Sequence, residues 1–388
     1  MNKIIQLLEK NLLFIFIASV SFFTYGQTLI IDHNCTNLNQ IPSEWINTAK
    51  QNLHIAYQHT SHGSQLITGM TGLQNWKGEQ FAFNNGGSSG ALDLHDYAIP
   101  GASDLGSPDR TSWAQATFNF LNDTKNSHVN VIIWSWCGQV SSADSSDIQT
   151  YLDLMTSLEN NFPNVRFVYM TGHLDGSGID GNLNQRNEQI KRYCTNNNKI
   201  LFDFADIESY DPDGNYYLGK MANDNCDYDS DNNGTRDKNW ALDWQGSHTE
   251  NIDWYNCSAA HSQALNGNRK AYAAWWLWAS LAGWKGVVAS AETNECFDVK
   301  SFTLSQNYPN PFNPTTNLVF RIPDAGFVSL RVYDILGNEI TTLINEYKLP
   351  GEYQVKFNAD KYNLTSGVYI YQLKAGKFVS SKKLTLVK

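Results

Sequence analysis

Residues 129–136 read VNVIIWSW, a nearly continuous apolar run. This pattern is typical of a strand that is buried on both faces of a sheet, where neither face is exposed to water. Apolar residues then recur at steps of three and four from Ile148 to Phe162, which predicts a helix beginning near Asp144 or Ser145. A buried strand followed by such a helix favours a parallel sheet.

The same alternation of strand and helix continues on both sides of this unit. Further strands are expected at 52–57, 165–170 and 200–204, and further helices at 182–196 and 263–284. The pattern predicts an α/β fold, with three layers (α/β/α) and a mostly parallel sheet. Ligands of such sheets bind at the carboxyl ends of the strands, so the loops after the strands are the places to look for chemistry.

Charge divides the 388-residue chain into two unlike parts. Residues 297–388 contain eleven Lys/Arg against seven Asp/Glu, whereas residues 27–296 contain fifteen against thirty. An acidic body of net charge −15 repels phosphate backbones, and we therefore expect no nucleic-acid partner. All Trp, His and Cys residues also lie before residue 297. Two domains are expected, 27–296 and 297–388.

Residues 1–26 are expected to be a signal peptide. Lys3 and Lys10 flank a polar start, and the apolar run at 12–23 is too short to span a bilayer comfortably. Cleavage is expected after Gly26, which leaves no transmembrane segment in the mature chain.

Export permits disulfide bonds, and the chain has six Cys residues. Cys226 and Cys257 flank an acidic segment and form one candidate pair. Cys35 and Cys296, at the two ends of the central segment, form another. Six Cys residues allow fifteen different sets of pairings, and their spacing in the sequence does not decide among them.

The last ninety or so residues predict a small all-β sandwich, because short alternating runs such as 328–332, 353–357 and 368–373 are separated by turn residues. Residues 308–316 read YPNPFNPTT. With the SGVY sequence at 366–369 and the terminal lysines, this segment resembles the type A sorting domain of the Bacteroidetes type IX secretion system. The resemblance implies a partner, the type IX secretion machinery, and a product that is secreted or attached to the outer surface.

Ser61 follows the first expected strand directly, within the sequence HTSHG at 59–63. A turn into a helix at this point would present its hydroxyl together with backbone N–H groups that can hold an oxyanion. A Ser hydroxyl needs a base, and His261, just before the last helix, is the candidate. Gly101 and Gln139, in loops of the same sheet edge, are candidate oxyanion donors.

This order of residues resembles the SGNH (GDSL-type) hydrolase superfamily over residues 54–284. The sequence HTSHG at 59–63 stands where that family has Gly-Asp-Ser, Gly138-Gln139 stands in place of Gly-x-Asn, and Ser258 occupies the position of the late Asp. The motifs are therefore degenerate versions of the family's own.

The resemblance implies that Ser61 is a nucleophile, His261 its base, and Gly101 and Gln139 the oxyanion donors. A backbone carbonyl or Asp253 would orient the imidazole. The implied function is a secreted serine esterase that forms an acyl-enzyme, and we expect it to be a carbohydrate (acetyl) esterase. Its expected partner is a polysaccharide or acylated carbohydrate, by analogy with other sorted proteins.

Three further histidines are expected near the site, and we assign them to substrate binding: His59, His62 and His173. The alternative is a zinc site made of the same three imidazoles.

The acidic segment 227–237 has oxygen ligands at every second position, which is typical of a calcium loop; the candidate metal ligands are Asp229, Asp231, Asn233 and Asp237. Trp240 stands at position twelve, where an EF-hand has Glu, so a complete EF-hand is excluded. A looser structural calcium site, completed by Asp243 or Asp224, would order an insertion near 208–255. No organic cofactor is expected.

A second function therefore remains open beside the esterase. It is a non-catalytic, calcium-dependent glycan-binding or adhesive surface protein on the same scaffold. A binding protein would not need Ser61 and His261 as a nucleophile and its base.

Overall fold

The structure is a computed structural model that describes residues 28–286, 302–322, 326–348 and 351–388. The described residues fall into two compact units, one before and one after residue 289. The expected signal peptide at 1–26, Cys296 and the domain boundary near 296 lie outside the described residues.

The first unit is built on a seven-stranded sheet in which every pairing is parallel, in the order β1-β7-β6-β5-β2-β4-β3. Its strands are β1 Leu29–Ile31, β2 His54–Gln58, β3 Phe83–Asn84, β4 Leu92–Asp96, β5 Val131–Trp134, β6 Arg166–Met170 and β7 Ile200–Phe202. The expected α/β class is confirmed. All four residues of β5 are at most 1% exposed, as the apolar run at 129–136 predicts.

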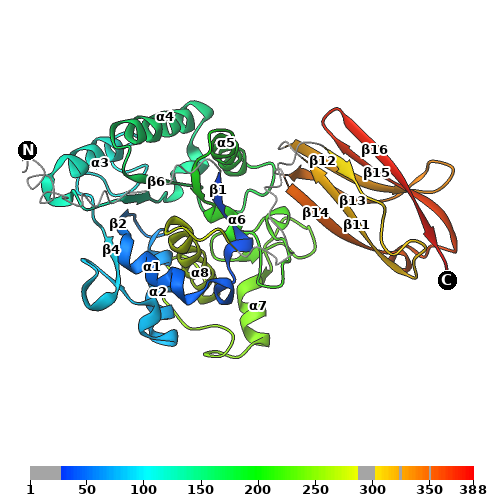
Figure 1. The fold of residues 1–388 in the computed structure, drawn as a ribbon, viewed down its shortest axis with the longest axis horizontal. Coiled ribbons are helices and arrows are strands. Elements are labelled where there is room, and N and C mark those ends of the chain that lie inside the picture. The colour runs from blue at the N-terminus through cyan, green and yellow to red at the C-terminus, as the bar shows by residue number, and fades with distance from the viewer. Residues whose placement is uncertain (1–27, 287–301, 323–325, 349–350) are drawn as a thin grey trace, which may run out of the picture. The chain divides into compact units, whose positions relative to one another are not determined.

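Helices cover both faces of this sheet: α3, α4 and α5 lie on one side, and α1, α2 and α8 on the other (Figure 1). Their bounds are α1 Ser43–Asn52, α2 Ser64–Lys77, α3 Ser112–Asn122, α4 Ser145–Asn161, α5 Asn182–Asn196, α6 Phe204–Glu208, α7 Trp240–Ser247 and α8 Ala264–Leu281. The start of α4 follows from its sequence, because Asp144 caps the helix and forms a capping box with Asp147.

The order of the strands reverses direction at β2, inside the sheet. After β2 the chain forms β3 and β4 on one side of β2, and then crosses to β5 on the other side. In doubly wound folds such a reversal separates the loops at the carboxyl ends of the two central strands and leaves room for a ligand. The strand order is shared by several doubly wound families, so it gives the architecture of the first unit and not its family.

The second unit is an antiparallel β-sandwich of two sheets, β10-β11-β14 and β13-β12-β15-β16. Its strands are β10 Thr303–Leu304, β11 Thr315–Ile322, β12 Gly326–Tyr333, β13 Glu339–Lys348, β14 Gly351–Asn358, β15 Gly367–Ala375 and β16 Phe378–Leu386. Alternate residues of β12, namely Val328, Leu330 and Val332, are fully buried between the sheets. The small β-sandwich that the sequence predicts is therefore present.

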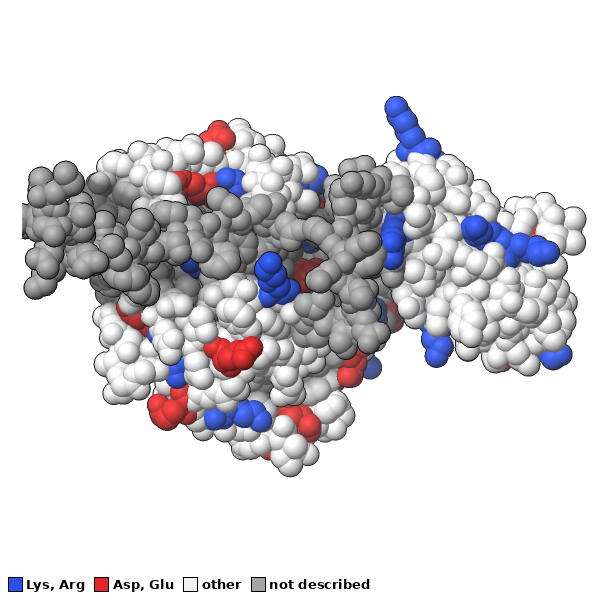
Figure 2. Space-filling view, in the orientation of Figure 1, with Lys and Arg blue, Asp and Glu red and all other residues white. Residues whose placement is uncertain are grey.

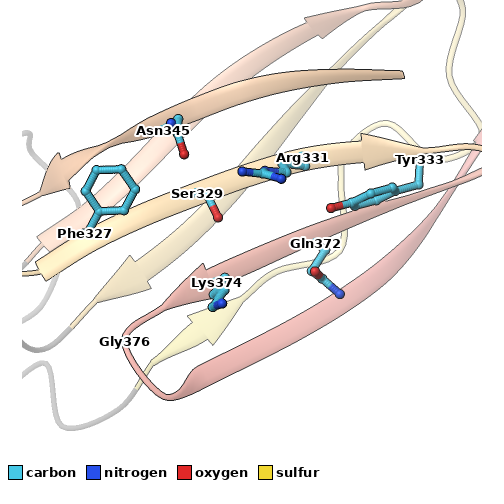
Figure 3. Close-up of a pocket in the computed structure, with 8 residues that line it drawn as sticks. All are labelled: Phe327, Ser329, Arg331, Tyr333, Asn345, Gln372, Lys374 and Gly376. Atoms are coloured by element: carbon cyan, nitrogen blue, oxygen red, sulfur yellow. The ribbon is translucent and has the colours of Figure 1, made fainter. Parts of the chain in front are cut away.

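The other side chains of β12 point away from this core. Phe327, Ser329, Arg331 and Tyr333 line a shallow hollow of about 430 Å³ on the outer face of the sheet (Figure 3). Lys and Arg side chains are spread over the visible face of this unit (Figure 2). The side chains that line this hollow include no Cys, His, Asp or Glu, the types that most often carry out catalysis.

Candidate functional site

Three loops at the carboxyl edge of the parallel sheet bring reactive side chains together. The turn after β2 carries His62 into the start of α2, the loop after β5 carries Cys137, and the loop after β6 carries His173. β5 pairs with both β2 and β6, so the three loops are neighbours. A fourth segment, from the acidic insertion, contributes Asp224.

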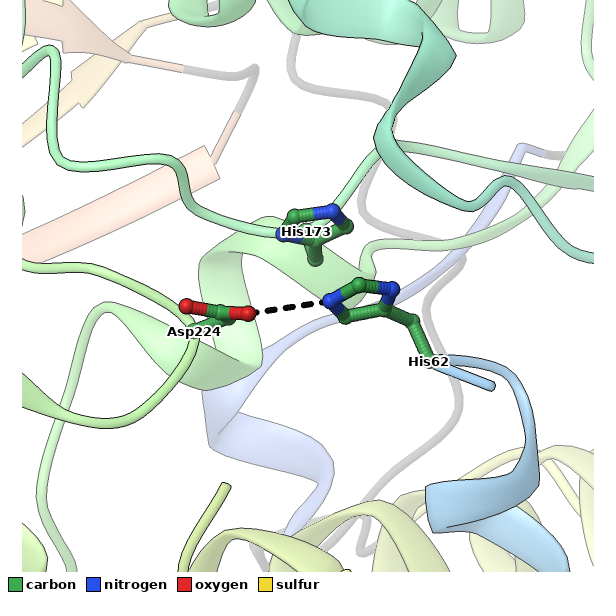
Figure 4. A group of neighbouring side chains, drawn as sticks. All are labelled: His62, His173 and Asp224. Carbon is green, nitrogen blue, oxygen red and sulfur yellow. Dashed lines mark hydrogen bonds and ion pairs between the residues drawn. The ribbon is translucent and has the colours of Figure 1, made fainter. Parts of the chain in front are cut away.

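His62 links a thiol to a carboxylate. Its Nδ1 lies 3.1 Å from Cys137 Sγ, and its Nε2 lies 2.9 Å from Asp224 Oδ2. Figure 4 shows the carboxylate of Asp224 directed at the edge of the imidazole. A nucleophile, a base and a carboxylate in this order are the parts of a catalytic triad, which is recognised by its geometry and not by the positions of its members in the sequence.

The charges of this triad favour a thiolate and an imidazolium. The hydrogen bond from His62, helped by Ser61 and Thr60 and opposed by burial, lowers the pKa of the Cys137 thiol to about 6. Burial alone would lower the pKa of His62, but Asp224 and Cys137 outweigh it and raise that pKa to about 9. Between these two values the pair of a Cys137 thiolate and a His62 imidazolium is favoured.

The segment that carries Asp224 is held by a second, smaller core. Ala222 and Cys226, on either side of Asp224, are fully buried, and they pack with Trp240 and Leu265 in one apolar cluster. The carboxylate therefore reaches the site from an anchored loop, and its side chain is 23% exposed.

His62 lies between two other imidazoles. The His173 ring stacks on it with 3.6 Å between centroids and 4° between the planes, and the His261 ring lies 4.6 Å from it at 22°. The backbone at His261 is in the left-handed region, with φ at 59°, and the side chain is exposed. Two of the histidines named from the sequence for substrate binding, His62 and His173, are thus at one place with the candidate base His261.

The alternative of a three-histidine zinc site does not match this arrangement. His59 is 1% exposed and points elsewhere: its Nε2 is 2.6 Å from Asp96 Oδ1, and its Nδ1 is 2.8 Å from the carbonyl oxygen of Thr60. One ligand atom from each of His62, His173 and Asp224 could be grouped within 4.8 Å. The lone pairs of an imidazole lie in its ring plane, however, and those of two parallel stacked rings do not converge on one ion.

Ser61 is at the site but is not paired with His261. Its Oγ lies 3.6 Å from Cys137 Sγ, and no hydrogen bond joins it to His261 among the described residues. Ser61 is therefore placed to donate to the sulfur.

Gln139 lies directly beside Cys137, with its side chain fully engaged. Its Oε1 accepts from the Cys137 N–H at 2.9 Å, and its Nε2 donates to Asp104 Oδ1 at 3.0 Å. Asp104 is 1% exposed and also accepts from Thr60 Oγ1 at 2.6 Å. The expected oxyanion donor is thus placed to hold the Cys137 loop against the loop after β2.

Gly101 lies in the loop after β4, with φ at 111°. A Cβ at this position would meet Ala116 of α3 at 3.2 Å. Among the described residues, no hydrogen bond joins Gly101 to Ser61, His62 or Cys137, so its expected role as an oxyanion donor stays a prediction.

A buried ion pair supports two loops of the site. Lys270 of α8 and Glu208 at the end of α6 are at most 1% exposed and lie 2.5 Å apart, from Nζ to Oε1. Glu208 Oε2 accepts from the N–H of Leu174, next to His173, at 2.8 Å. Lys270 also donates to Gln65, whose Nε2 donates to the carbonyl oxygen of Ala260, next to His261. The two histidine loops therefore share one charged support.

The acidic loop connects two short paired strands, β8 Asp227–Tyr228 and β9 Lys238–Asn239. Asp229 is 2% exposed and accepts from the N–H groups of Asn233 and Gly234, and these backbone hydrogen bonds keep its pKa low against the effect of burial. Gly234 has φ at 87°, as the sharp turn of a calcium loop requires.

Among the described residues, the groups of three close His, Cys, Asp or Glu side chains do not include this loop. Asp237 is bonded to the N–H and hydroxyl of Ser230, and Asp231 to Asn233. Calcium binding by Asp229, Asp231, Asn233 and Asp237 stays a prediction.

The expected disulfide between Cys226 and Cys257 is absent. All five described cysteines are free thiols. The sulfur of Cys226 contacts Ser262 Oγ, whereas that of Cys257 contacts Asn268 and the carbonyl oxygen of Ala264, so each sulfur packs against partners of its own. The other candidate pair includes Cys296, which lies outside the described residues.

Within the described residues, no helix has both the length and the hydropathy that crossing a bilayer requires.

No curated protein matches the chain. Solved structures that match include dimeric latent PorU from Porphyromonas gingivalis, with 17% identity over 22% of this chain and 9% of that chain and a TM-score of 0.19. PorZ of the type IX secretion system of the same organism matches with 18% identity over 24% and 12%, at a TM-score of 0.17. The chain thus spans about a tenth of the length of these two proteins. An endo-β-1,4-mannanase from Thermotoga petrophila matches with 11% identity over 67% and 47%, at a TM-score of 0.17. TM-scores this low support no argument about fold or activity.

One family model matches the chain, the secretion system C-terminal sorting domain, at residues 306–387. The match coincides with the β-sandwich and with the YPNPFNPTT motif that begins at Tyr308. The second unit is therefore a type IX sorting domain, and the chain is a cargo of that secretion machinery, released or held at the outer surface of the cell.

Proposed function

We propose that the first unit is a secreted cysteine-dependent hydrolase that cleaves acyl compounds, with Cys137 as nucleophile, His62 as general acid and base, and Asp224 as the group that orients His62. The observation that carries the proposal is the bridging position of His62, whose two ring nitrogens face the thiol and the carboxylate at 3.1 and 2.9 Å. Cys137 is also the described cysteine whose pKa is lowered, while burial raises the pKa of Cys226 to about 12 and that of Cys257 to about 11.

The proposed reaction proceeds in two steps. The Cys137 thiolate attacks the carbonyl carbon, a C–S bond forms, and His62 gives its Nδ1 proton to the leaving group as the bond to that group breaks. The products are a thioester on Cys137 and the free leaving group. Water then attacks the thioester, His62 takes the proton of the water, and the acid and the thiolate are released.

Ser61 and Gln139 support this reaction in the proposal. Ser61 Oγ is a hydroxyl donor 3.6 Å from the sulfur, and it stabilises negative charge there. Gln139 holds the Cys137 loop through Asp104.

The serine esterase that the resemblance to SGNH hydrolases implies stays a prediction, as do its acylated carbohydrate substrate and the calcium-dependent binding protein. The same experiment separates these functions. The mature protein is treated with iodoacetamide, with a fluorophosphonate, and with p-nitrophenyl acetate as substrate, in parallel with Cys137→Ala and Ser61→Ala variants. Cys257→Ala is the matched control for loss of a thiol.

Our proposal predicts that iodoacetamide labels Cys137 and abolishes turnover, and that Cys137→Ala is inactive. Ser61→Ala should be slower but still active, because it loses a donor to the sulfur, and Cys257→Ala should keep full activity. Fluorophosphonate labelling of Ser61, with turnover that survives Cys137→Ala, would establish the serine enzyme instead. Absence of label and turnover would favour the binding protein.

A further inference from the structure

The free nitrogen of His173 is a hydrogen-bond acceptor that the triad does not use. His173 Nδ1 lies 2.9 Å from the carbonyl oxygen of Leu174, so this nitrogen carries the proton and donates it. Nε2 is then left with a lone pair. It is buried, and no described group of the protein is bonded to it.

This nitrogen lies near the backbone of the residue that follows the nucleophile. A Cβ on Gly138, the residue after Cys137, would be 4.0 Å from His173 Nε2. The ring also stacks on His62, with 3.6 Å between the ring centroids, and Figure 4 shows the two imidazoles one above the other. His173 Nε2 is thus an acceptor at the edge of the triad.

The ring is held so that it cannot easily turn this acceptor away. The stack with His62 covers one face, and the bond to Leu174 fixes the tautomer. Leu174 is itself held by the carboxylate of Glu208, which accepts from its N–H. Burial lowers the pKa of His173, and the charge of His62 adds to this effect, while the charges of Glu208 and Asp224 oppose it; the net lowering favours the neutral ring.

We propose that His173 is a specificity residue whose Nε2 accepts the N–H of a scissile amide, so that the enzyme cleaves amides in preference to esters of the same acid. The inference rests on the proposed function, because it concerns the substrate of the same site.

Chemistry favours an amide for two reasons. The leaving atom of an ester is an oxygen that carries no hydrogen, so an ester gives the buried acceptor His173 Nε2 no hydrogen-bond donor. The N–H of a secondary amide supplies that donor. An N–H held by His173 also fixes the direction of the nitrogen lone pair, which must take the proton of His62 before the C–N bond breaks. His173 moves no proton itself, and the balance of the reaction is unchanged.

The test compares a p-nitroanilide and a p-nitrophenyl ester of one acyl group in the full mature chain. His173→Phe keeps an aromatic ring for the stack but removes the acceptor. His261→Phe is the matched control, because His261 also stacks on His62 but is exposed.

We expect His173→Phe to lower kcat/KM for the anilide by about 10- to 100-fold more than for the ester. The rate at which iodoacetamide alkylates Cys137 should change by less than about threefold, which excludes damage to the triad itself. His261→Phe should leave the ratio of anilide to ester cleavage unchanged.

Equal losses on both substrates in His173→Phe would overturn this inference and leave the proposed function standing. Turnover that is the same in wild type and Cys137→Ala, or absent for both substrates, would overturn the proposed function and the inference with it.

Discussion

His62 Nδ1 lies 3.1 Å from Cys137 Sγ, although the two residues are 75 positions apart in the chain. The parallel pairing of β2 with β5 explains the contact. Gln58 and Trp134, at the ends of these strands, are paired in register. His62 comes four residues after Gln58 and Cys137 three residues after Trp134, so both reach the same height above the sheet. The pairing of two strands thus forms the centre of the site.

Alkylation of Cys137 by iodoacetamide should follow a pH midpoint near 6, because His62 stabilises the thiolate. In His62→Gln the midpoint should rise toward about 9, which is the ordinary pKa of a cysteine thiol. Mass spectrometry of the labelled peptide against pH measures both midpoints. Cys257 is the internal control, since burial raises its pKa to about 11. The same midpoint in the two proteins would contradict the ion pair.

The kcat/KM for hydrolysis should show a bell-shaped dependence on pH. Its lower limb, near 6, is where Cys137 loses its proton, and its upper limb, near 9, is where His62 loses its own. The two values belong to the coupled pair. Asp224→Asn removes the carboxylate that raises the pKa of His62, so the upper limb should move to lower pH and kcat/KM at pH 8.5 should fall about tenfold. Asp213→Asn, an exposed acid of the same insertion, should leave the profile unchanged. An upper limb that stays in place in Asp224→Asn would rule out this role.

Lys270→Met should strongly reduce the free energy of unfolding, by about 3–5 kcal/mol, because it leaves the buried carboxylate of Glu208 without its cation. Lys125→Met, at an exposed position, should change it by about 0.5 kcal/mol or less. Urea unfolding of the two variants measures the difference. Equal stabilities would show that the ion pair is not what supports the two histidine loops.

Gly63→Ala should destabilise the first unit by about 1–3 kcal/mol. An added Cβ would lie 2.2 Å from Ser135 Oγ and 2.7 Å from the Tyr57 hydroxyl, which is closer than atoms can pack. The matched control is Gly246→Ala in α7, where a Cβ meets nothing within 4 Å and stability should be unchanged or slightly higher. Thermal melting of both variants tests the claim, and a Gly63→Ala protein that melts with the wild type would refute it.

Removal of calcium should lower the melting temperature if the acidic loop binds the ion as its sequence predicts. Calcium at 100 times its Kd would stabilise the folded chain by about 2.7 kcal/mol. Asp229→Asn should abolish the difference between calcium and EDTA. An unchanged melting curve in EDTA would show that the loop does not bind a stabilising calcium ion.

The elements that periodicity identified best are those whose pattern is long or purely apolar. The helix expected at 182–196 has these bounds in the structure, and the apolar run at 129–136 contains β5. The last run of the sorting domain was less well predicted. Val368 and Ile370 are 38% and 37% exposed, because Tyr371 and Leu373 of β15 occupy the inner face instead. Aromatic and aliphatic residues on both faces of one strand make its alternation ambiguous.

The candidate site was located by sequence but assembled differently by the fold. Ser61, His62, His173 and Gln139 all come from loops at the carboxyl ends of strands, where topology alone places them. Cys137 stands in the same kind of loop, directly after a core strand, and that position is the signal by which it could have been recognised.

The amino-acid sequence by itself determined the α/β class, the sorting domain and the edge of the sheet where the candidate site lies, because each depends on local periodicity or on a contiguous motif. The tertiary structure decided which groups are paired. Asp224 is 162 residues from His62 and reaches it only because Ala222 and Cys226 are buried in a separate apolar core. Hydrogen bonding depends on distances of a few tenths of an ångström and on ring orientation, and these follow from packing between segments that lie far apart in the chain.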